Sequence, residues 1–370
     1  DGHRQVSTLP SIYLSEFFDS GTWHRLTAGG WDEIAERFIA EYPVLFDASR
    51  PDAVPTTGFK AIANLGRKEG MTQVGVNADE ILSVNENVFR RELESLMAQF
   101  QHLDALSFFQ LLHLAYEKAL NNLHDKSAIF YHIHNPDTNA KLNFSRLAPE
   151  ALWLVMVREP TQSCESWVKN DFFNADYDAV VAAIVSMLLQ IDDPVLADRK
   201  AVGIRLEDLK NYPEQTLRSM CEWMEIEEEP SLYFMSAQKK KWWGDESSPD
   251  IREANKKPFQ KASIERENGY IFSEKDRYIL QTLFYPFRVR FGYAEGNSSE
   301  FQDDLEKIRP SLDQLFDFEL KLAKKTKIAP KQLMNSMSFK YFRACLIERW
   351  QTLERYQTYP NMLKQLIIIS

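Results

Sequence analysis

The fold class follows from residues 151–157, Ala-Leu-Trp-Leu-Val-Met-Val, and from the triplet Arg158-Glu159-Pro160 directly after them. The run is apolar without alternation, as expected for a strand whose two faces are both covered in a parallel sheet. Two more short apolar runs, residues 128–133 and 201–204, are also predicted to be strands. Residues 177–191 predict a helix, and the strand–helix–strand order indicates a right-handed crossover. The sequence therefore predicts an α/β fold.

Helical spacing of apolar residues continues through much of the remaining chain. Residues 78–123 predict two or three amphipathic helices, and residues 31–40 and 214–224 predict one each. The sequence Ser273-Glu274-Lys275-Asp276 predicts the capped start of a helix that runs to about residue 291. Residues 239–261 are polar and without a period, which predicts a long ordered loop, and such loops are often functional.

Composition indicates a globular protein and limits its partners. The 370 residues are 44% hydrophobic and 26% charged, with a formal net charge of -10. This charge argues against nucleic-acid binding, which needs a basic face. No stretch of 18 apolar residues occurs, so no transmembrane segment is expected. Three widely spaced cysteines in no metal-ligand pattern favour a reducing compartment, and a cytoplasmic location is therefore expected.

Arg158 and Ser166 are the first candidate binding residues. Arg158 follows the predicted strand, and Ser166 comes eight residues later, near the start of a predicted helix. An arginine at the end of a strand and a serine near a helix N-terminus can converge on one anion, which the helix dipole also favours. The alternative is a solvated or ion-paired arginine without a ligand.

With these two residues the chain resembles the PAPS-dependent sulfotransferases, in which Arg158 and Ser166 match the positions that bind the 3'-phosphate of the donor. The resemblance implies a P-loop-like, three-layer α/β/α fold with a central parallel sheet. Residues 1–298 are expected to form this domain, and the helical pattern of residues 299–370, after a connector, predicts a helical extension packed on it. The segment Gly203-Ile204-Arg205-Leu206-Glu207-Asp208-Leu209 resembles a second sequence block of the same family. We expect its residues Arg205, Glu207 and Asp208 to brace the fold by ion pairing.

A third block, Lys240-Lys241-Trp242-Trp243-Gly244, stands where bacterial-type members of that family carry a basic loop over the nucleotide. Lysines neutralise an anionic donor, a glycine lets the backbone approach closely, and a tryptophan face can stack on adenine. The resemblance therefore implies that these five residues contact the donor. A charged exposed turn with core tryptophans is the alternative.

His134 is the candidate catalytic residue. It lies two residues before Pro136, in the position of a catalytic histidine in the family that the chain resembles. A neutral imidazole is suited to taking the proton of an attacking hydroxyl, because its pKa is near working pH. His132 alternates to the opposite face of the predicted strand and is expected to be structural or to line the substrate site.

The loop of this family that binds the 5'-phosphosulfate is not found in its expected context, and the numbering starts at Asp1, after the position expected for that loop. The segment Asp19-Ser20-Gly21-Thr22-Trp23 spells part of the loop pattern, but no apolar strand precedes it. Residues 366–370 read as a strand that can lead into such a loop, which would imply a permuted numbering. A helical tail is the alternative.

The predicted function is transfer of a sulfuryl group from PAPS to a hydroxyl or amine of a small-molecule or carbohydrate acceptor, without a metal ion. The alternative is a noncatalytic protein of the same fold that binds a nucleotide or a partner. A nucleoside kinase is disfavoured because no Gly-x-x-x-x-Gly-Lys-Ser/Thr loop occurs.

Overall fold

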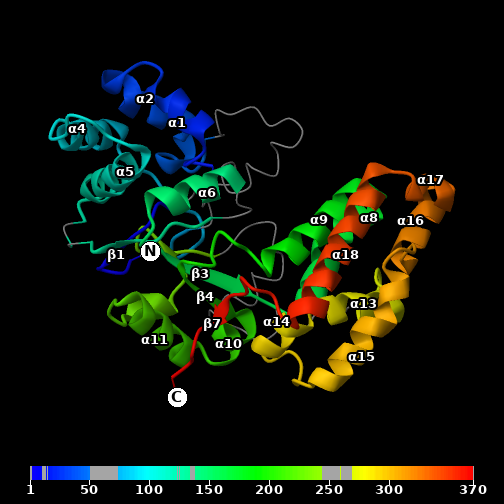
Figure 1. Cartoon of the computed structure of the whole chain (residues 1–370). Helices are drawn as coiled ribbons and strands as arrows, with labels where there is room; N and C mark the ends of the chain where they lie inside the picture. Colours follow the sequence, from blue (N-terminus) through cyan, green and yellow to red (C-terminus); the bar gives the residue numbers. More distant parts are fainter. Residues whose placement is uncertain are drawn as a thin grey trace. The chain divides into compact units, whose positions relative to one another are not determined.

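The computed structural model forms two compact units (Figure 1). The first unit comprises Asp1–Ala151 and Met220–Gln260, and the second comprises Leu152–Ser219 and Lys261–Ser370. The structure describes residues 2–10, 14, 16–50, 74–122, 124, 126–133, 138–243, 259 and 269–369. Residues 299–370, the expected helical extension, lie in the second unit, while the boundary at residue 298 stays a prediction.

The first unit is mainly helical, with one short parallel sheet and one hairpin. Its parallel strands are β1 (Val6–Ser7) and β2 (Ala128–Ile129). The strand predicted over residues 128–133 is thus only two residues long in the structure, because its partner β1 is equally short. The helices are α1 (Ser20–Thr27), α2 (Ile34–Glu41), α4 (Glu86–Met97), α5 (Ala105–Ala119) and α6 (Thr138–Leu147), with short 3-10 turns η1 (Trp31–Glu33), η2 (Pro43–Leu45) and η3 (Pro230–Tyr233).

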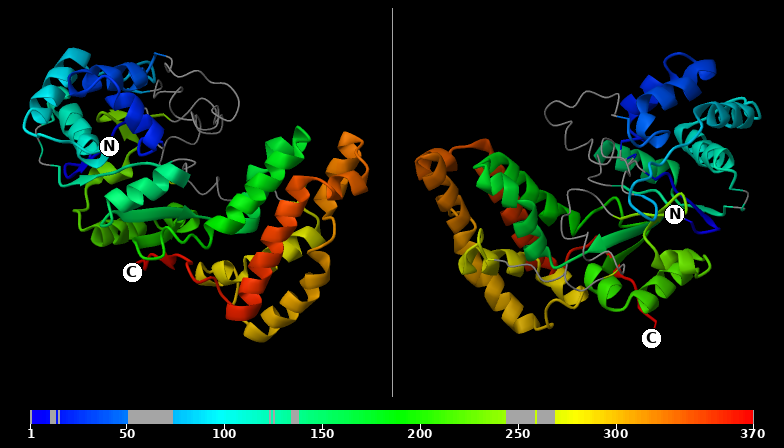
Figure 2. Two further views of the ribbon diagram at one scale, coloured as in Figure 1. Left: turned by 45° about the horizontal axis from the view of Figure 1, so that its top comes forward. Right: turned by 180° about the vertical axis from the view of Figure 1, so that it is seen from behind.

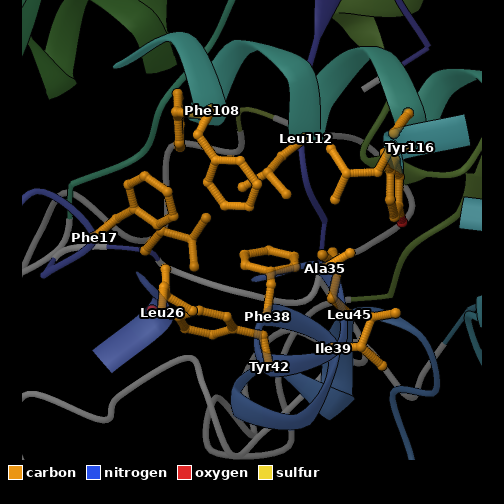
Figure 3. Close-up of a cluster of buried hydrophobic side chains, with 14 of the residues drawn as sticks. Phe17, Leu26, Ala35, Phe38, Ile39, Tyr42, Leu45, Phe108, Leu112 and Tyr116 are labelled. Atoms are coloured by element: carbon orange, nitrogen blue, oxygen red, sulfur yellow. The ribbon is translucent and has the colours of Figure 1, made fainter. Parts of the chain in front are cut away.

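Aromatic side chains fill the core of the first unit. Phe38 of α2 and Phe108 of α5 are completely buried, and their ring centroids lie 6.2 Å apart in an edge-to-face arrangement (Figure 3). Such edge-to-face pairs add to the hydrophobic stabilisation from burial. Asn85 and Asp104 cap α4 and α5 by accepting hydrogen bonds from the backbone amides of Val88 and Ser107. The predicted helical segment of residues 78–123 therefore consists of two helices around an aromatic core.

A three-stranded parallel sheet characterises the second unit. Its strand order is β3 (Leu152–Val157), β4 (Lys200–Arg205) and β7 (Lys364–Gln365). Between β3 and β4 the chain forms α7 (Pro160–Trp167), α8 (Lys169–Phe173) and α9 (Tyr177–Gln190). This parallel strand–helix–strand unit confirms the predicted α/β class. The predicted three layers around one central sheet stay a prediction, since the described strands form separate sheets of two or three strands.

Most of the remaining helices of the second unit pack on one another. The remaining helices are α10 (Leu206–Asn211), α13 (Glu274–Leu283), α14 (Tyr285–Arg290), α15 (Ser298–Ile308), α16 (Asp317–Thr326), α17 (Pro330–Met334) and α18 (Met337–Tyr356), with the 3-10 turn η5 (Arg309–Ser311); α11 (Pro213–Met224) belongs in part to each unit. Helix α18 packs on α9, and α10 lies against β4. Figure 2 shows the red α18 beside the green α9. No helix in the described ranges is long and apolar enough to cross a membrane.

Two buried acids hold these helices together. Asp276 caps α13 together with Ser273, and it also accepts hydrogen bonds from the amides of Asp317 and Phe318 at the start of α16. Glu319 of α16 has no exposed surface and forms an ion pair with Arg343 of α18. These carboxylates replace water as acceptors for groups that folding buries.

Candidate functional site

Arg158 lies at the carboxyl end of the parallel sheet, as predicted from the strand before it. β3 ends at Val157, and the register pairs Val157 with Arg205, the last residue of β4. The carboxyl ends of parallel strands share one edge, which is where α/β proteins commonly bind ligands. Arg158 is half-buried at this edge.

The N-terminus of α7 is capped by the side chain of Glu159. Glu159 is the capping residue, and its carboxylate accepts a hydrogen bond of 2.7 Å from the amide of Gln162. Arg288 donates its Nε–H to the other oxygen at 3.1 Å. An anion at this N-terminus would meet the negative charge of Glu159. The predicted contribution of the helix N-terminus to anion binding is therefore wrong for α7, and binding would depend on side chains.

Ser166 lies near the end of α7 and not near its start, which corrects the prediction. The helix begins at Pro160 because proline suits the first helical position and lacks the amide hydrogen that would be unsatisfied there. Ser166 follows Glu159 by seven residues, about two helical turns, so both lie on the same face of α7. The half-buried Ser166 thus belongs to the helical face that begins beside Arg158.

The residue before Ser166 fixes α7 in place. The buried carboxylate of Glu165 accepts hydrogen bonds from the amides of Gly269, at 3.0 Å, and Ile271, at 2.9 Å. This contact could not be predicted from the sequence, because its partners are separated by more than 100 residues and no local pattern joins them. These hydrogen bonds tie the end of α7, where Ser166 lies, to the segment of Gly269 and Ile271.

Arg205 and Asp208 form the predicted ion pair at the end of β4, whereas Glu207 is held there by a hydrogen bond from Tyr293. Arg205 lies 3.7 Å from Asp208 and over the ring of Tyr293 at 4.8 Å from its centroid. The Tyr293 hydroxyl donates a 2.7 Å hydrogen bond to Glu207. Burial raises the pKa of Asp208 although Arg205 opposes this, and burial together with Glu207 raises the pKa of Tyr293. Arg205 therefore has a structural role, and Arg158 is the arginine that we propose binds a ligand.

Lys240 and Lys241 belong to a hairpin in the first unit. Strand β5 (Ser236–Ala237) pairs with β6 (Lys240–Lys241), and the two turn residues Gln238 and Lys239 both have positive φ, at 49° and 62°. This is the backbone of a type I′ turn. Residues 239–243, the described beginning of the predicted long loop, therefore form a turn, a strand and its end.

The charged groups of this hairpin have protein partners. Lys240 forms a 2.7 Å ion pair with Glu80, and the Lys241 ammonium lies over the Trp243 ring at 3.3 Å from its centroid. Trp243 donates its indole N–H to the carbonyl oxygen of Gly75 at 2.7 Å. One face of Trp243 is thus covered by Lys241.

Trp242 has a packing role. It lies against a small core cluster formed by Ala48, Val74, Leu82 and Ala237. This arrangement agrees with the alternative interpretation of the block as a charged turn with a core tryptophan. Gly244, the last residue of the block, lies outside the described residues.

The predicted site residues fall into separate parts of the structure. Arg158 and Ser166 are in the second unit, and residues 240–243 are in the first. His134 lies outside the described residues, while His132 is exposed. Convergence of these residues on one ligand stays a prediction, and so does the catalytic role of His134.

The rejected loop candidate Asp19-Ser20-Gly21-Thr22-Trp23 forms the capped start of α1. The Asp19 carboxylate accepts hydrogen bonds from the amides of Gly21 and Thr22, at 2.8 and 3.4 Å. Because these amides already bind a carboxylate, they are not available to cradle a phosphate. Among the described residues, no group of three His, Cys, Asp or Glu side chains is placed to hold a metal ion.

Comparison with known proteins gives one distant similarity. No family model and no curated protein matches the chain. A solved structure described as "Sulfotransferase Domain from the Curacin Biosynthetic Pathway" is similar over 67% of this chain and 82% of that one, with 14% sequence identity and a TM-score of 0.22. The backbones superpose too loosely for positions in that domain to be transferred to this chain.

Proposed function

We propose that this protein is a sulfotransferase that uses PAPS and transfers its sulfuryl group to a hydroxyl or amine of a small-molecule or carbohydrate acceptor. The observation that carries the proposal is the position of Arg158 directly after β3, with Ser166 on the same unit's following helix. A guanidinium and a hydroxyl bind phosphate through charge-assisted hydrogen bonds. We assign the 3'-phosphate of the donor to these two side chains.

In the proposed reaction, the acceptor atom attacks sulfur in line with the bond from sulfur to the donor's bridging phosphate oxygen. That bond breaks, and the 3',5'-bisphosphate nucleotide leaves with its electron pair. His134 takes the proton from the acceptor. Positioning and charge neutralisation supply most of the rate acceleration in such transfers, and no step calls for a metal ion.

Residues 240–244 are assigned to the nucleotide, which requires a change of partners. Lys240 would exchange the carboxylate of Glu80 for a donor phosphate, and Trp243 would stack on the adenine. Lys240→Ala is then expected to weaken nucleotide binding, whereas Glu80→Gln is expected to strengthen it a few-fold because Lys240 is released. Unchanged affinity in both variants would remove Lys240 from the site.

The decisive experiment is calorimetric titration of the purified chain with adenosine 3',5'-bisphosphate. Arg158→Ala is expected to weaken binding by about 10- to 100-fold, since a hydrogen bond to a charged group contributes about 1.5–3 kcal/mol. Ser166→Ala should weaken it by about tenfold or less. Arg355→Ala is the matched control, because Arg355 is an exposed arginine of the same unit, on α18.

The outcomes separate the two functions that the sequence left open. Binding that depends on Arg158, together with sulfuryl transfer from PAPS that is lost in His134→Asn, supports the enzyme. Binding that depends on Arg158 without any transfer supports the noncatalytic nucleotide-binding alternative. A folded chain that does not bind the bisphosphate, or binds it equally well in the Arg158 and Arg355 variants, contradicts the enzyme and the nucleotide-binding alternative and leaves a noncatalytic protein that binds a partner.

A further inference from the structure

One segment of this acidic protein contains lysines and no acids. Residues 320–347 include Lys321, Lys324, Lys325, Lys327, Lys331 and Lys340, whereas neither aspartate nor glutamate occurs between Glu319 and Glu348. The formal net charge of the whole chain is -10, so the remainder is more acidic still. Charge of one sign in a short segment produces a local field that favours anionic partners.

The structure places these lysines around the turn between two helices of the second unit. The segment comprises the end of α16, the short helix α17 and the start of α18, and α17 lies at the end where the other two meet (Figure 1). All six lysines are exposed. We call the surface formed by residues 324–341 the lysine-rich tip.

Four of the lysines make no hydrogen bond or ion pair with the described residues: Lys324, Lys327, Lys331 and Lys340. Lys321 and Lys325, by contrast, donate to backbone carbonyl oxygens, of Ile271 and Phe173 respectively. An acid at the edge of the tip is Asp178 of α9, which accepts a hydrogen bond from Ser338. The charge of the other four lysines is thus available to a partner.

Large apolar side chains are exposed between these lysines. The exposed fractions are 42% for Ile328, 40% for Met334, 78% for Met337 and 56% for Tyr341. Leu333 and Phe339, which lie between these exposed residues in the sequence, are buried. The tip therefore combines protruding apolar groups with a surrounding set of positive charges.

From this combination we infer that the lysine-rich tip binds the surface of anionic lipid bilayers. The apolar side chains enter the boundary between headgroups and acyl chains, while the lysines remain at the level of the lipid phosphates and carboxylates. Flexible methionine side chains insert without a preformed complementary groove. The anionic bilayer repels the acidic remainder of the chain, and this repulsion orients the lysine-rich tip toward the bilayer. This inference is independent of the proposed sulfotransferase activity.

The test is sedimentation of the full chain with vesicles. Binding is expected with phosphatidylcholine vesicles that contain phosphatidylserine, and not with pure phosphatidylcholine, and added salt should weaken it. The triple variant Lys324→Gln, Lys327→Gln, Lys331→Gln should bind on the order of 100-fold more weakly, because each lysine near an anionic surface contributes about a factor of 5. Its control is Lys275→Gln, Lys307→Gln, Lys364→Gln, which removes three exposed lysines elsewhere in the same unit.

The apolar part of the surface is tested by Met337→Ser, which keeps every charge and should also weaken vesicle binding. Circular dichroism checks that each variant is folded. Equal binding by the tip variant and its control would overturn the inference. It would also be overturned if Met337→Ser bound vesicles as wild type does and soluble polyglutamate competed fully, since the tip would then be a site for acidic polymers or proteins.

Discussion

His113 is a buried histidine whose ring is held in the core of the first unit. Only 2% of its surface is exposed, and its Nδ1 lies 3.0 Å from the Ser7 hydroxyl. Its Nε2 has no hydrogen-bond partner among the described residues. Burial lowers the pKa of His113 to about 3 from the ordinary 6.5. The ring is therefore neutral in the folded protein throughout the physiological range.

This histidine should make the first unit sensitive to acid. Below pH 6.5 the unfolded chain binds a proton at His113 that the folded chain does not bind, so stability is lost as the pH falls from 6.5 toward about 3. The expected slope from this residue is about 1.4 kcal/mol per pH unit. Urea denaturation across this pH range measures it. His113→Gln should flatten the slope, whereas the exposed His102→Gln should not; equal slopes in all three proteins would contradict the prediction.

Gly203 illustrates a close approach that only glycine permits. A Cβ atom at this position would lie 2.5 Å from the Phe291 ring and 3.2 Å from Val157. Both neighbours are buried, so neither can move aside freely. Gly203→Ala is expected to lower the free energy of unfolding by about 1–3 kcal/mol through overpacking. Thermal denaturation checks this, and Gly296→Ala is the control because a Cβ atom there meets only an ordinary contact of 3.4 Å.

At the scale of an element, α18 ends on a residue with an unfavourable backbone conformation. Gln357 follows the last helical residue with φ of 55°, and its amide donates to the Leu353 carbonyl oxygen at 2.8 Å. Glycine is preferred in this left-handed conformation because it has no Cβ. Gln357→Gly should raise stability by about 1 kcal/mol. The same substitution at Gln351, inside the helix, should lower it by about 1 kcal/mol; a loss of stability at both positions would refute the prediction.

The elements that the sequence predicts correctly are those with a strong local signal. The run Leu152–Val157 and the helix Tyr177–Gln190 agree with prediction in type and position, since a continuous apolar run and the capping residue Asp176 are both local signals. The prediction that both faces of this strand are covered is wrong, because Leu152 and Met156, on one face, are 40% and 51% exposed. The hairpin of β5 and β6 escaped prediction because Gln238-Lys239 is not a residue pair preferred in such turns. In the same way, the position of Arg158 follows from the strand before it, whereas the contacts of Glu159 and Glu165 join segments more than 100 residues apart.

At the scale of the whole molecule, each unit has a core of its own. The aromatic cluster of the first unit consists of residues between Leu14 and Ala140. In the second unit, the buried faces of α9, α13, α16 and α18 include the ion pair of Glu319 with Arg343. Tyr177 donates a 2.6 Å hydrogen bond to the same Glu319, so three helices meet at one carboxylate. Because the cores are separate, a substitution that destabilises one unit is expected to lower the stability of that unit more than that of the other.

Arg343→Met tests this independence. The variant leaves the buried Glu319 without its cation, and loss of one partner of a buried ion pair costs about 3–5 kcal/mol. Hydrogen exchange followed peptide by peptide should show faster exchange in α9, α16 and α18, by a factor on the order of 100 or more, with α4 and α5 of the first unit unchanged. Arg355→Met is the control, because Arg355 is an exposed arginine of the same helix. If exchange accelerated equally in α5, the two units would unfold as one cooperative structure, and the division by separate cores would not describe their stability.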